Sequence, residues 1–233
     1  MAGCEAAWQI AEAGEEAELY EMKPARYTPA HKSPLFAELI CSNSLKAARI
    51  ESAAGLLKEE MRRLGSLLTD CAAACAVPAG GALAVDRNEF SALVTKRIRE
   101  HPRIHIREAE EVTKLPLDGV SIVATGPLTS DALATQIREL CGGGLSFFDA
   151  AAPIVTAESI DRSKIFCASR YDKGGDDAYL NCPMDRPAYE AFRDALAAAE
   201  RAPLHDCDVR DPKVYEGCMP IEVLAQRGMD AMR

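Results

Sequence analysis

Two cysteines have the surroundings that a catalytic thiol needs. Cys41 stands before the segment 42–44, Ser-Asn-Ser, whose residue types cap the start of a helix. Free amide donors at a helix start lower a thiol's pKa and favour the nucleophilic thiolate. Cys218 lies between Gly217 and Pro220 in a segment too irregular for a core strand, which predicts an exposed turn. For either cysteine, the alternative is the role of a small buried hydrophobic residue.

The other cysteines are interpreted as packing residues. The chain has nine cysteines, none spaced C-x-x-C, which favours a reduced cytoplasmic compartment over a disulfide framework or a zinc site. Cys71 and Cys75 share one face of a predicted helix. The same packing role is assigned to Cys4, Cys141, Cys167 and Cys207, whereas Cys182 is left open. His101 and His105 flank a proline and cannot form a helical metal pair, so no metal site is predicted.

A second kind of chemistry is indicated at the beginning of the chain, where the segment 2–21 predicts a small-residue turn, a helix and a short strand. Gly3 lets backbones approach closely, Gly14 is placed to end the helix, and Glu21 closes the strand. Glu21 follows Gly3 by eighteen residues, close to the spacing that puts a carboxylate on the ribose of a dinucleotide. A plain helix–strand pair without a ligand accounts for the pattern equally well.

The elements that must position these residues follow in order along the chain. Residues 22–34 predict a basic loop interrupted by prolines, and residues 45–76 predict one long helix. The cations of that helix form either a solvated face or an RNA-binding surface, with the solvated face favoured. They are Lys46, Arg49, Lys58, Arg62 and Arg63.

The next hundred residues alternate between strand and helix patterns. Residues 77–87 predict a glycine-centred turn and a short strand, followed by a helix over 88–100. Residues 104–106 and 112–115 predict a hairpin or a crossing pair of strands. The apolar run 120–124 suits a strand buried on both faces of a parallel sheet, and Thr129 or Ser130 can cap a helix over 131–140. The pattern predicts an α/β fold.

The pattern changes at the glycines that follow Cys141. Short strand patterns at 152–155, 164–168 and 178–181 and a helix over 186–200 predict an inserted α+β domain. We therefore divide the chain into a first, dinucleotide-binding domain over 1–140, an insertion over 141–210 and a segment over 211–233 that returns to the first domain.

Composition limits the classes of partner. The chain has 233 residues, with 48% hydrophobic and 27% charged residues, which is ordinary for a globular protein. No apolar run approaches the length of a membrane span, and no membrane partner is predicted. The net charge of −9 means that an RNA contact must come from a local basic surface.

Several of these segments together resemble one family. They include AGCEAAWQIAEAG, TPAHKSPLFAELICSNSLKA, VPAGGALAVDR, ATGPLTSDAL and YEGCMPIEVLAQRG. In this order they are similar to the folate- and flavin-dependent tRNA (uracil-5-)-methyltransferases, over nearly the whole chain. A-T-G alone is weakly specific, but HK-to-CSNSL, VPAGGALAVDR and YEGCMPIE in series are strongly specific.

The resemblance implies a fold, a reaction and its cofactors. The fold is a glutathione-reductase-like Rossmann domain that binds FAD and carries an inserted domain. The reaction transfers a one-carbon unit from methylenetetrahydrofolate to carbon 5 of a T-loop uridine in tRNA, with NAD(P)H as the source of electrons. Cys41 and Cys218 stand at the places of the family's two cysteines. Cys41 is assigned as the nucleophile that adds to carbon 6, and Cys218 as the base or the flavin-side partner.

The resemblance also implies cofactor positions in this sequence. They are Gly3 at the pyrophosphate, Glu21 on the ribose, Lys23 beside the adenosine half, Gly80, Gly81 and Arg87 near the flavin, and Gly126 at the end of a flavin-contacting strand.

The chain departs from the family pattern at both ends. Family members have an apolar strand and G-A-G-L before A-G, where this chain has Met1, and they continue past the position of Arg233. We therefore expect the chain as written to bind FAD poorly or not at all. The alternatives are a related FAD-dependent tRNA-modifying protein, a thiol-dependent flavoprotein and a non-catalytic remnant.

Overall fold

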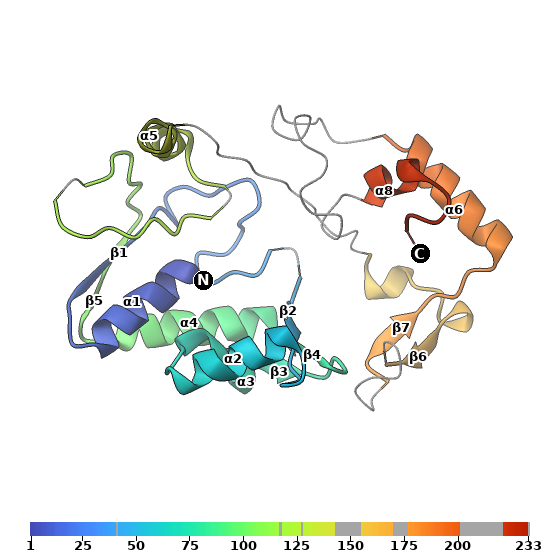
Figure 1. The fold of residues 1–233 in the computed structure, drawn as a ribbon, viewed down its shortest axis with the longest axis horizontal. Helices are drawn as coiled ribbons and strands as arrows, with labels where there is room; N and C mark the ends of the chain where they lie inside the picture. The colour runs from blue at the N-terminus through green and yellow to red at the C-terminus, as the bar shows by residue number, and fades with distance from the viewer. Residues whose placement is uncertain are drawn as a thin grey trace. The chain divides into compact units, whose positions relative to one another are not determined.

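The structure, a computed structural model, describes residues 1–40, 42–116, 118–126, 128–142, 155–169, 177–200 and 221–232. The chain divides into two compact units. Unit 1 comprises Met1–Gly144 and Ser169–Ala178, and unit 2 comprises Leu145–Ala168 and Tyr179–Arg233. The first boundary lies a few residues after the predicted change at Cys141. Figure 1 gives the element labels used below.

Unit 1 begins with the predicted helix and strand. Helix α1 (Ala2–Glu12) starts directly after Met1, so Gly3 lies in the first helical turn and not in a preceding turn. The helix ends at Glu12 with Ala13 as the C-cap residue, and Gly14 follows with a φ of +96°. The amides of Gly14 and Glu15 donate to the carbonyls of Ala11 and Ile10 at 3.0 and 3.2 Å, which is the Schellman pattern. Strand β1 (Ala17–Glu21) follows, as predicted.

The parallel sheet of unit 1 joins segments that lie far apart in sequence. Strand β5 (Ile104–Glu108) pairs in parallel with β1, with Ala17 opposite Ile104 and Glu21 opposite Glu108. The α/β class is therefore confirmed. The predicted hairpin between 104–106 and 112–115 is wrong, because β5 pairs with β1 and residues 112–115 form no strand. Figure 1 shows β1 and β5 side by side, with α1 and α4 next to them.

The predicted long helix over 45–76 is also wrong. The segment contains strand β2 (Ser44–Ala47), helix α2 (Ala53–Arg63) and helix α3 (Leu67–Ala74). Strands β2, β3 (Ala76–Val77) and β4 (Ala82–Val85) form an antiparallel sheet in the order β2-β4-β3. Residues 44–47 form a strand and not a helix because they pair with β4. The two helices start at N-cap residues within the segment, Ser52 and Ser66, which accept from Gly55 N and Thr69 N at 3.1 and 3.2 Å.

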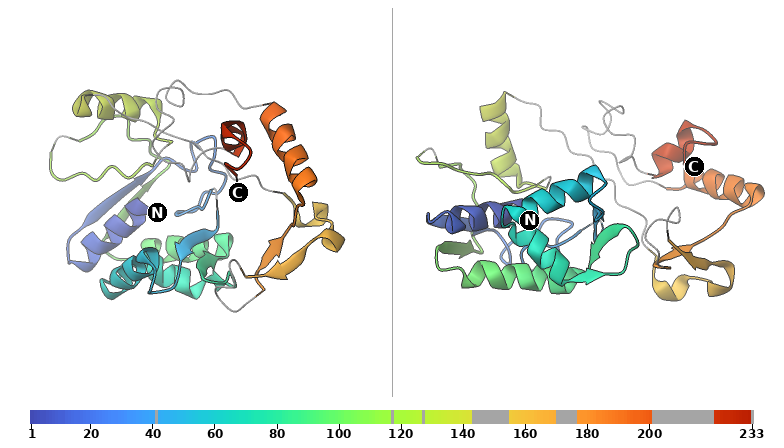
Figure 2. Two further views of the ribbon diagram at one scale, coloured as in Figure 1. Left: turned by 45° about the vertical axis from the view of Figure 1, so that its right-hand side comes forward. Right: turned by 60° about the horizontal axis from the view of Figure 1, so that its bottom comes forward.

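Helix α4 (Arg87–Glu100) provides much of the core. The side chain of Asp86 caps it by accepting from the amides of Asn88 and Glu89, both at 2.9 Å. Its apolar face packs against α1, α3 and the parallel sheet. The buried core of unit 1 includes Phe90, Val94 and Ile98 from α4, Ala7 and Ala11 from α1, and Leu67 and Cys71 from α3. The two views of Figure 2 show α4 beside α3, which in turn packs against α2.

A carboxylate joins two helices of this unit. Glu5 of α1 accepts from Ser66 Oγ and from Leu68 N, both at 3.0 Å, at the start of α3. A negative side chain at a helix start satisfies otherwise free amides and is favoured by the helix dipole. Glu5 thus fixes the beginning of α3 against α1.

The predicted buried strand at 120–124 is absent. Residues 120–126 have no regular structure, and Val120 and Ile122 are 97% and 59% exposed. A strand pairs along its edges with neighbouring strands and is buried on its faces by the helices that cover the sheet. In the described part of unit 1, the parallel sheet has only β1 and β5, and no strand pairs with residues 120–124. Helix α5 (Asp131–Cys141) follows as predicted, with Ser130 as N-cap residue but without a side-chain capping bond.

Unit 2 combines a short hairpin with helices. Strands β6 (Phe166–Ala168) and β7 (Tyr179–Asn181) pair antiparallel, with Cys167 opposite Leu180. Two 3-10 turns, Ala157–Ser159 and Arg162–Lys164, precede them. Helix α6 (Arg186–Ala198) is capped by Asp185 and packs against α8 (Ile221–Arg227).

The return of 211–233 to the first domain remains a prediction. Within unit 2, Tyr189 Oη of α6 donates to the carbonyl of Met229 at 2.6 Å, just after α8. The described residues of this segment therefore pack with α6. None of the helices in the described ranges is long and apolar enough to cross a bilayer.

Candidate functional site at the end of strand β1

Glu21 lies at the carboxyl end of β1, the end of a parallel strand where ligands bind in open α/β sheets. Its carboxylate is half-buried and accepts from the amide of Lys23 at 3.1 Å. Because a helix and the strand after it run in opposite directions across a short turn, the start of α1 lies at this same end of β1. The two residues that suggested a nucleotide site, Gly3 and Glu21, are thus brought to one side of the unit.

Lys23 is buried, unlike most lysines, and is 5% exposed. Its Nζ donates to the carbonyls of Ser33 and Leu35 at 3.2 and 2.6 Å. The ammonium thereby ties the start of the proline-interrupted loop to its end. A direct contact between Lys23 and the adenosine half of a cofactor remains a prediction. The hydrogen bonds that Lys23 Nζ makes in the structure go to carbonyls of the loop.

We expect Lys23→Met to lower the free energy of unfolding by about 1–3 kcal/mol. The substitution keeps the apolar stem but leaves two partly buried carbonyls without a donor. Urea unfolding of the chain measures the effect. Lys32→Met is the matched control because Lys32 is exposed and its side chain has no hydrogen bond among the described contacts. Equal stability of Lys23→Met and the wild type would contradict the role of Lys23 in holding the two ends of the loop together.

Charges at this end of the sheet act on one another. Burial raises the pKa of the Cys4 thiol, the Glu21 carboxylate adds to the rise, and the Lys23 ammonium opposes it. Burial lowers the pKa of His31, and the Lys23 ammonium lowers it further. His31 Nδ1 lies 2.6 Å from Thr28 Oγ1. The first turn of α1, the end of β1 and the basic loop therefore form one electrostatic neighbourhood.

Gly126 follows Ala124 by two residues, and Ala124 lies close to Gly3 at the start of α1. A Cβ placed on Gly3 would lie 3.5 Å from the Cβ of Ala124, which is ordinary contact. Gly126 itself has a φ of +74° and open space around it, so a glycine is favoured there for its backbone conformation.

The other predicted cofactor positions lie elsewhere in unit 1. Gly80 has a φ of +61° and, with Gly81, forms the turn between β3 and β4. Gly81 faces Arg49, whose Nε would lie 3.1 Å from a Cβ at that position. Arg87 begins α4 and lines a hollow of about 180 Å³. That hollow is also lined by Leu39, two residues before Cys41 in the sequence.

The two predicted catalytic cysteines, Cys41 and Cys218, lie outside the described residues. The structure nevertheless corrects the reason given for a low pKa at Cys41. No helix starts at 42–44, because Asn43 pairs with Val85 of β4 through bonds of 3.0 and 3.1 Å and residues 44–47 form β2. The nearest following helix begins at Ala53. The helix start that the sequence predicted directly after Cys41 is therefore absent.

The remaining cysteines divide by burial. Cys4, Cys71 and Cys75 are buried, as predicted for packing residues. Burial raises the pKa of Cys71 to about 11, which keeps the thiol protonated at neutral pH. Cys141 and Cys167 are exposed, so their assignment to packing is wrong, and Cys182 is exposed as well. Cys207 lies outside the described residues.

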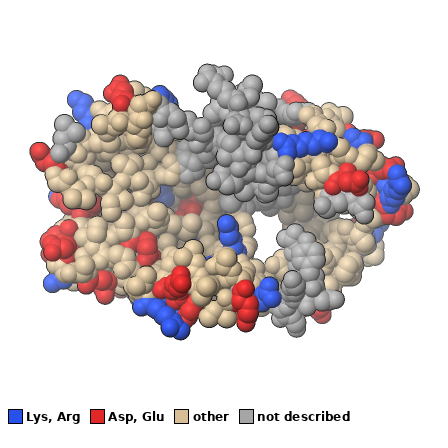
Figure 3. Space-filling model, viewed as in Figure 1, with Lys and Arg blue, Asp and Glu red and all other residues tan. Residues whose placement is uncertain are grey.

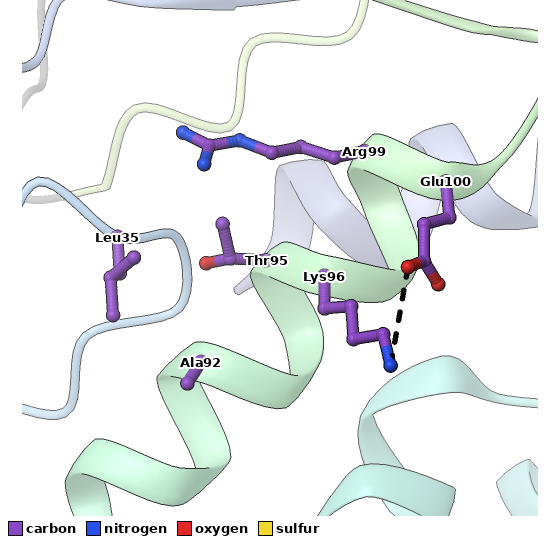
Figure 4. Close-up of a pocket in the computed structure, with 6 residues that line it drawn as sticks. All are labelled: Leu35, Ala92, Thr95, Lys96, Arg99 and Glu100. Carbon is purple, nitrogen blue, oxygen red and sulfur yellow. Dashed lines mark ion pairs between the residues drawn. The ribbon is translucent and has the colours of Figure 1, made fainter.

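The larger of the two hollows described in unit 1 has a volume of about 320 Å³ and lies between α4 and the segment that carries Leu35. Figure 4 shows Thr95 and Arg99 extending from α4 towards Leu35, with Lys96 turned towards Glu100. The cations there have acidic partners: Arg99 lies 2.5 Å from Glu108, and Lys96 lies 4.0 Å from Glu100. Thr95 Oγ1 accepts from Phe36 N at 2.9 Å. This hollow shows no free charge that would mark a binding site.

Two positioning residues were missed by sequence reasoning. Glu38 accepts from the amides of Lys32 and Ser33 at 3.1–3.2 Å and closes the end of the basic loop. Thr95 holds the segment just after that loop through Phe36 N. The sequence signals were an acid, Glu38, and a hydroxyl, Thr95, each within an otherwise apolar pattern. Such a signal does not show which backbone amide the side chain binds. In the described ranges, no three His, Cys, Asp or Glu side chains gather as a metal site.

Comparison with known proteins gives matches along the whole chain. Residues 1–233 match the family model described as Glucose inhibited division protein A. The chain is also similar to proteins named methylenetetrahydrofolate–tRNA-(uracil-5-)-methyltransferase TrmFO. The protein from Lactobacillus gasseri is 56% identical over 233 residues, covering 100% of this chain and 52% of the relative. That from Geobacter sulfurreducens is 55% identical over 235 residues, covering 100% and 53%.

A third relative, from Desulfitobacterium hafniense, is 57% identical over 229 residues, covering 98% of this chain and 52% of the relative. The chain thus spans about half the length of the curated relatives that it matches. Residues 1–233 match the family model, and the parallel pairing of β1 and β5 is consistent with the α/β fold. The chain belongs to the Glucose inhibited division protein A family.

Proposed function

We propose that this chain is part of a flavin- and folate-dependent methyltransferase that forms 5-methyluridine in the T-loop of tRNA. The observation that carries the proposal is the 55–57% identity, along essentially the whole chain, to proteins named as methylenetetrahydrofolate–tRNA-(uracil-5-)-methyltransferases. Since the chain spans about half their length, we assign the activity to the complete gene product that contains these residues. Its proposed location is the cytoplasm, with tRNA as its macromolecular partner.

The proposed cofactor is FAD, bound where α1 starts and β1 ends. The residues there fit the group: Glu21 offers a carboxylate to ribose hydroxyls, and the start of α1 with Gly3 is a site for phosphate. Gly126 has open space around it on the same side. We place FAD in a glutathione-reductase-like Rossmann domain, with 141–210 as an inserted α+β domain. The hairpin and helices of unit 2 support that class.

Cys41 and Cys218 carry the proposed chemistry. When bound, FAD supplies the electrons that NAD(P)H delivers, and methylenetetrahydrofolate supplies the carbon. The Cys41 thiolate forms a bond to carbon 6 of uracil, which makes carbon 5 nucleophilic towards the one-carbon unit. Cys218 would take the carbon-5 proton, and the carbon–nitrogen bond between the one-carbon unit and folate would break. The two electrons from NAD(P)H, supplied through the bound flavin, would reduce the transferred methylene to a methyl group, and the Cys41 thiolate would leave carbon 6 as the sulfur–carbon bond breaks. Cys218 as the flavin-side partner remains the second assignment.

The test is methyl transfer by the complete gene product. An unmodified tRNA transcript is incubated with the protein, FAD, methylenetetrahydrofolate and NADPH, and its nucleosides are analysed by mass spectrometry. We expect 5-methyluridine in the T-loop only when folate is present. A transcript with cytidine at the T-loop position is the control. Absence of 5-methyluridine with all components present would favour a related FAD-dependent tRNA-modifying protein, a thiol-dependent flavoprotein or a non-catalytic remnant.

A further inference from the structure

The cations that suggested either a solvated face or an RNA surface fall into two sets. Arg62 and Arg63 both contact Glu59, with hydrogen bonds of 2.7–2.8 Å. The two guanidinium groups lower the pKa of Glu59 to about 2. This set is a solvated face in which positive and negative charges offset one another, so it offers little attraction to a polyanion.

Lys46, Arg49 and Lys58 form the second set, and none of them has an acidic partner within the part of the chain that the structure describes. Lys58 Nζ donates to the carbonyls of Ala47 and Ala54 at 2.9 and 3.1 Å. Partial burial lowers the pKa of Lys58, and the nearby Lys46 ammonium lowers it further. Two like charges are thus held close together with no carboxylate to balance them, which is the arrangement that an external anion stabilises.

The backbone holds these three residues in place. Lys46 has a φ of +68° and lies at a bulge in β2, between the pairs Ser44–Ala84 and Ala47–Ala82. Positive φ is unfavourable for a lysine, and bulges commonly re-aim a side chain. The following loop is fixed as well, because Ala48 N donates to the carbonyl of Gly81 at 2.9 Å. The absence of a side chain at Gly81 leaves space for Arg49.

We propose that Lys46, Arg49 and Lys58 form a phosphate-binding site for the sugar-phosphate backbone of the RNA substrate. The proposal rests on the proposed function, which makes RNA the partner. Lys46 and Arg49 are exposed and line neither of the two described hollows, so the site suits an extended polyanion better than an enclosed small one. A net charge of −9 gives no general attraction to RNA, and a local site must therefore supply it. Figure 3 shows basic and acidic side chains interspersed over the face that it draws.

The experiment measures binding of a fluorescent T-arm RNA hairpin to the complete gene product by anisotropy, at several salt concentrations. We expect K46A/R49A to weaken binding about tenfold near physiological salt and to reduce the slope of log K against log salt by about 1.5, since each lost phosphate contact removes about 0.7–0.9. R62A/R63A is the matched control, because it removes the same charge from the ion-paired set. We expect that control to change affinity less than about twofold.

A separate variant distinguishes binding from folding. K46G removes the charge but suits the positive φ, so it should keep or raise the thermal stability while weakening hairpin binding about threefold. Three results would overturn the proposal: unchanged binding by K46A/R49A, equal losses in both double variants, or displacement of the hairpin by FAD at micromolar concentration. If the hairpin depends on Lys46 and Arg49 but no 5-methyluridine forms, the phosphate site stands and the proposed methyltransferase function fails.

Discussion

Cys41→Ala is expected to abolish the covalent complex with a T-arm RNA that carries 5-fluorouridine at the target position. If Cys41 is the nucleophile that adds to carbon 6, no other thiol can replace it. The expected loss of the covalent complex is therefore complete rather than partial. Denaturing gel electrophoresis of the complete gene product with labelled RNA measures the complex. The same variant should form no 5-methyluridine.

Cys218→Ala is the partner variant in this experiment. As the base, Cys218 acts after the sulfur–carbon bond has formed, so its removal should leave the covalent complex and stop turnover. The exposed Cys182 provides a control thiol whose substitution by alanine should change neither readout. A complex that survives Cys41→Ala but is lost in Cys218→Ala would reverse the two assignments.

Gly55→Ala is expected to lower the free energy of unfolding of the chain by about 3 kcal/mol or more, or to prevent cooperative folding. A Cβ at this position would lie 1.8 Å from the carbonyl oxygen of Arg49 and 3.0 Å from that of Ala48. Both are backbone atoms, so relief requires movement of the loop that joins β2 to α2. Helix propensity alone predicts the opposite, a gain of about 1 kcal/mol for alanine over glycine. The sign of the change therefore decides between packing and propensity.

Gly65→Ala is the control for that substitution. Gly65 has a φ of +76° and no atom within 4 Å of an added Cβ. Its replacement should cost about 1–2 kcal/mol through backbone conformation alone. Urea unfolding followed by circular dichroism measures both variants. A Gly55→Ala protein as stable as wild type would show that the loop at Arg49 is free to move, and the placement of Arg49 would then need revision.

Local pattern was sufficient where an element is stabilised by its own residues. Helix α1 and strand β1 were predictable because Gly14 ends the helix and alternation begins directly afterwards. The strand–helix pair β4–α4 was predictable because Asp86 caps α4 within the segment itself. The resemblance to the methyltransferase family likewise depends only on ordered short motifs.

Pattern failed where partners distant in sequence decide the conformation. Residues 44–47 have helix-compatible side chains, yet Asn43 and Ala48 find backbone partners at Val85 and Gly81, and those bonds favour a strand. The run 120–124 has the composition of a buried strand, but in the described part of unit 1 no strand pairs with it. Composition indicates that a segment can be buried, but burial requires neighbouring strands that pair with it and helices that cover the faces of the sheet.

The sequence by itself therefore determined the family resemblance and the α/β class, and it proposed the residues that carry the chemistry. Only the tertiary structure placed Glu21 and the start of α1 on one side of the sheet, and only it separated Arg62 and Arg63 from the unbalanced charges at Lys46 and Lys58. The physical reason is the same in both cases. Residue type sets what a side chain can bind, whereas charge balance and proximity depend on contacts between segments that the chain order does not reveal.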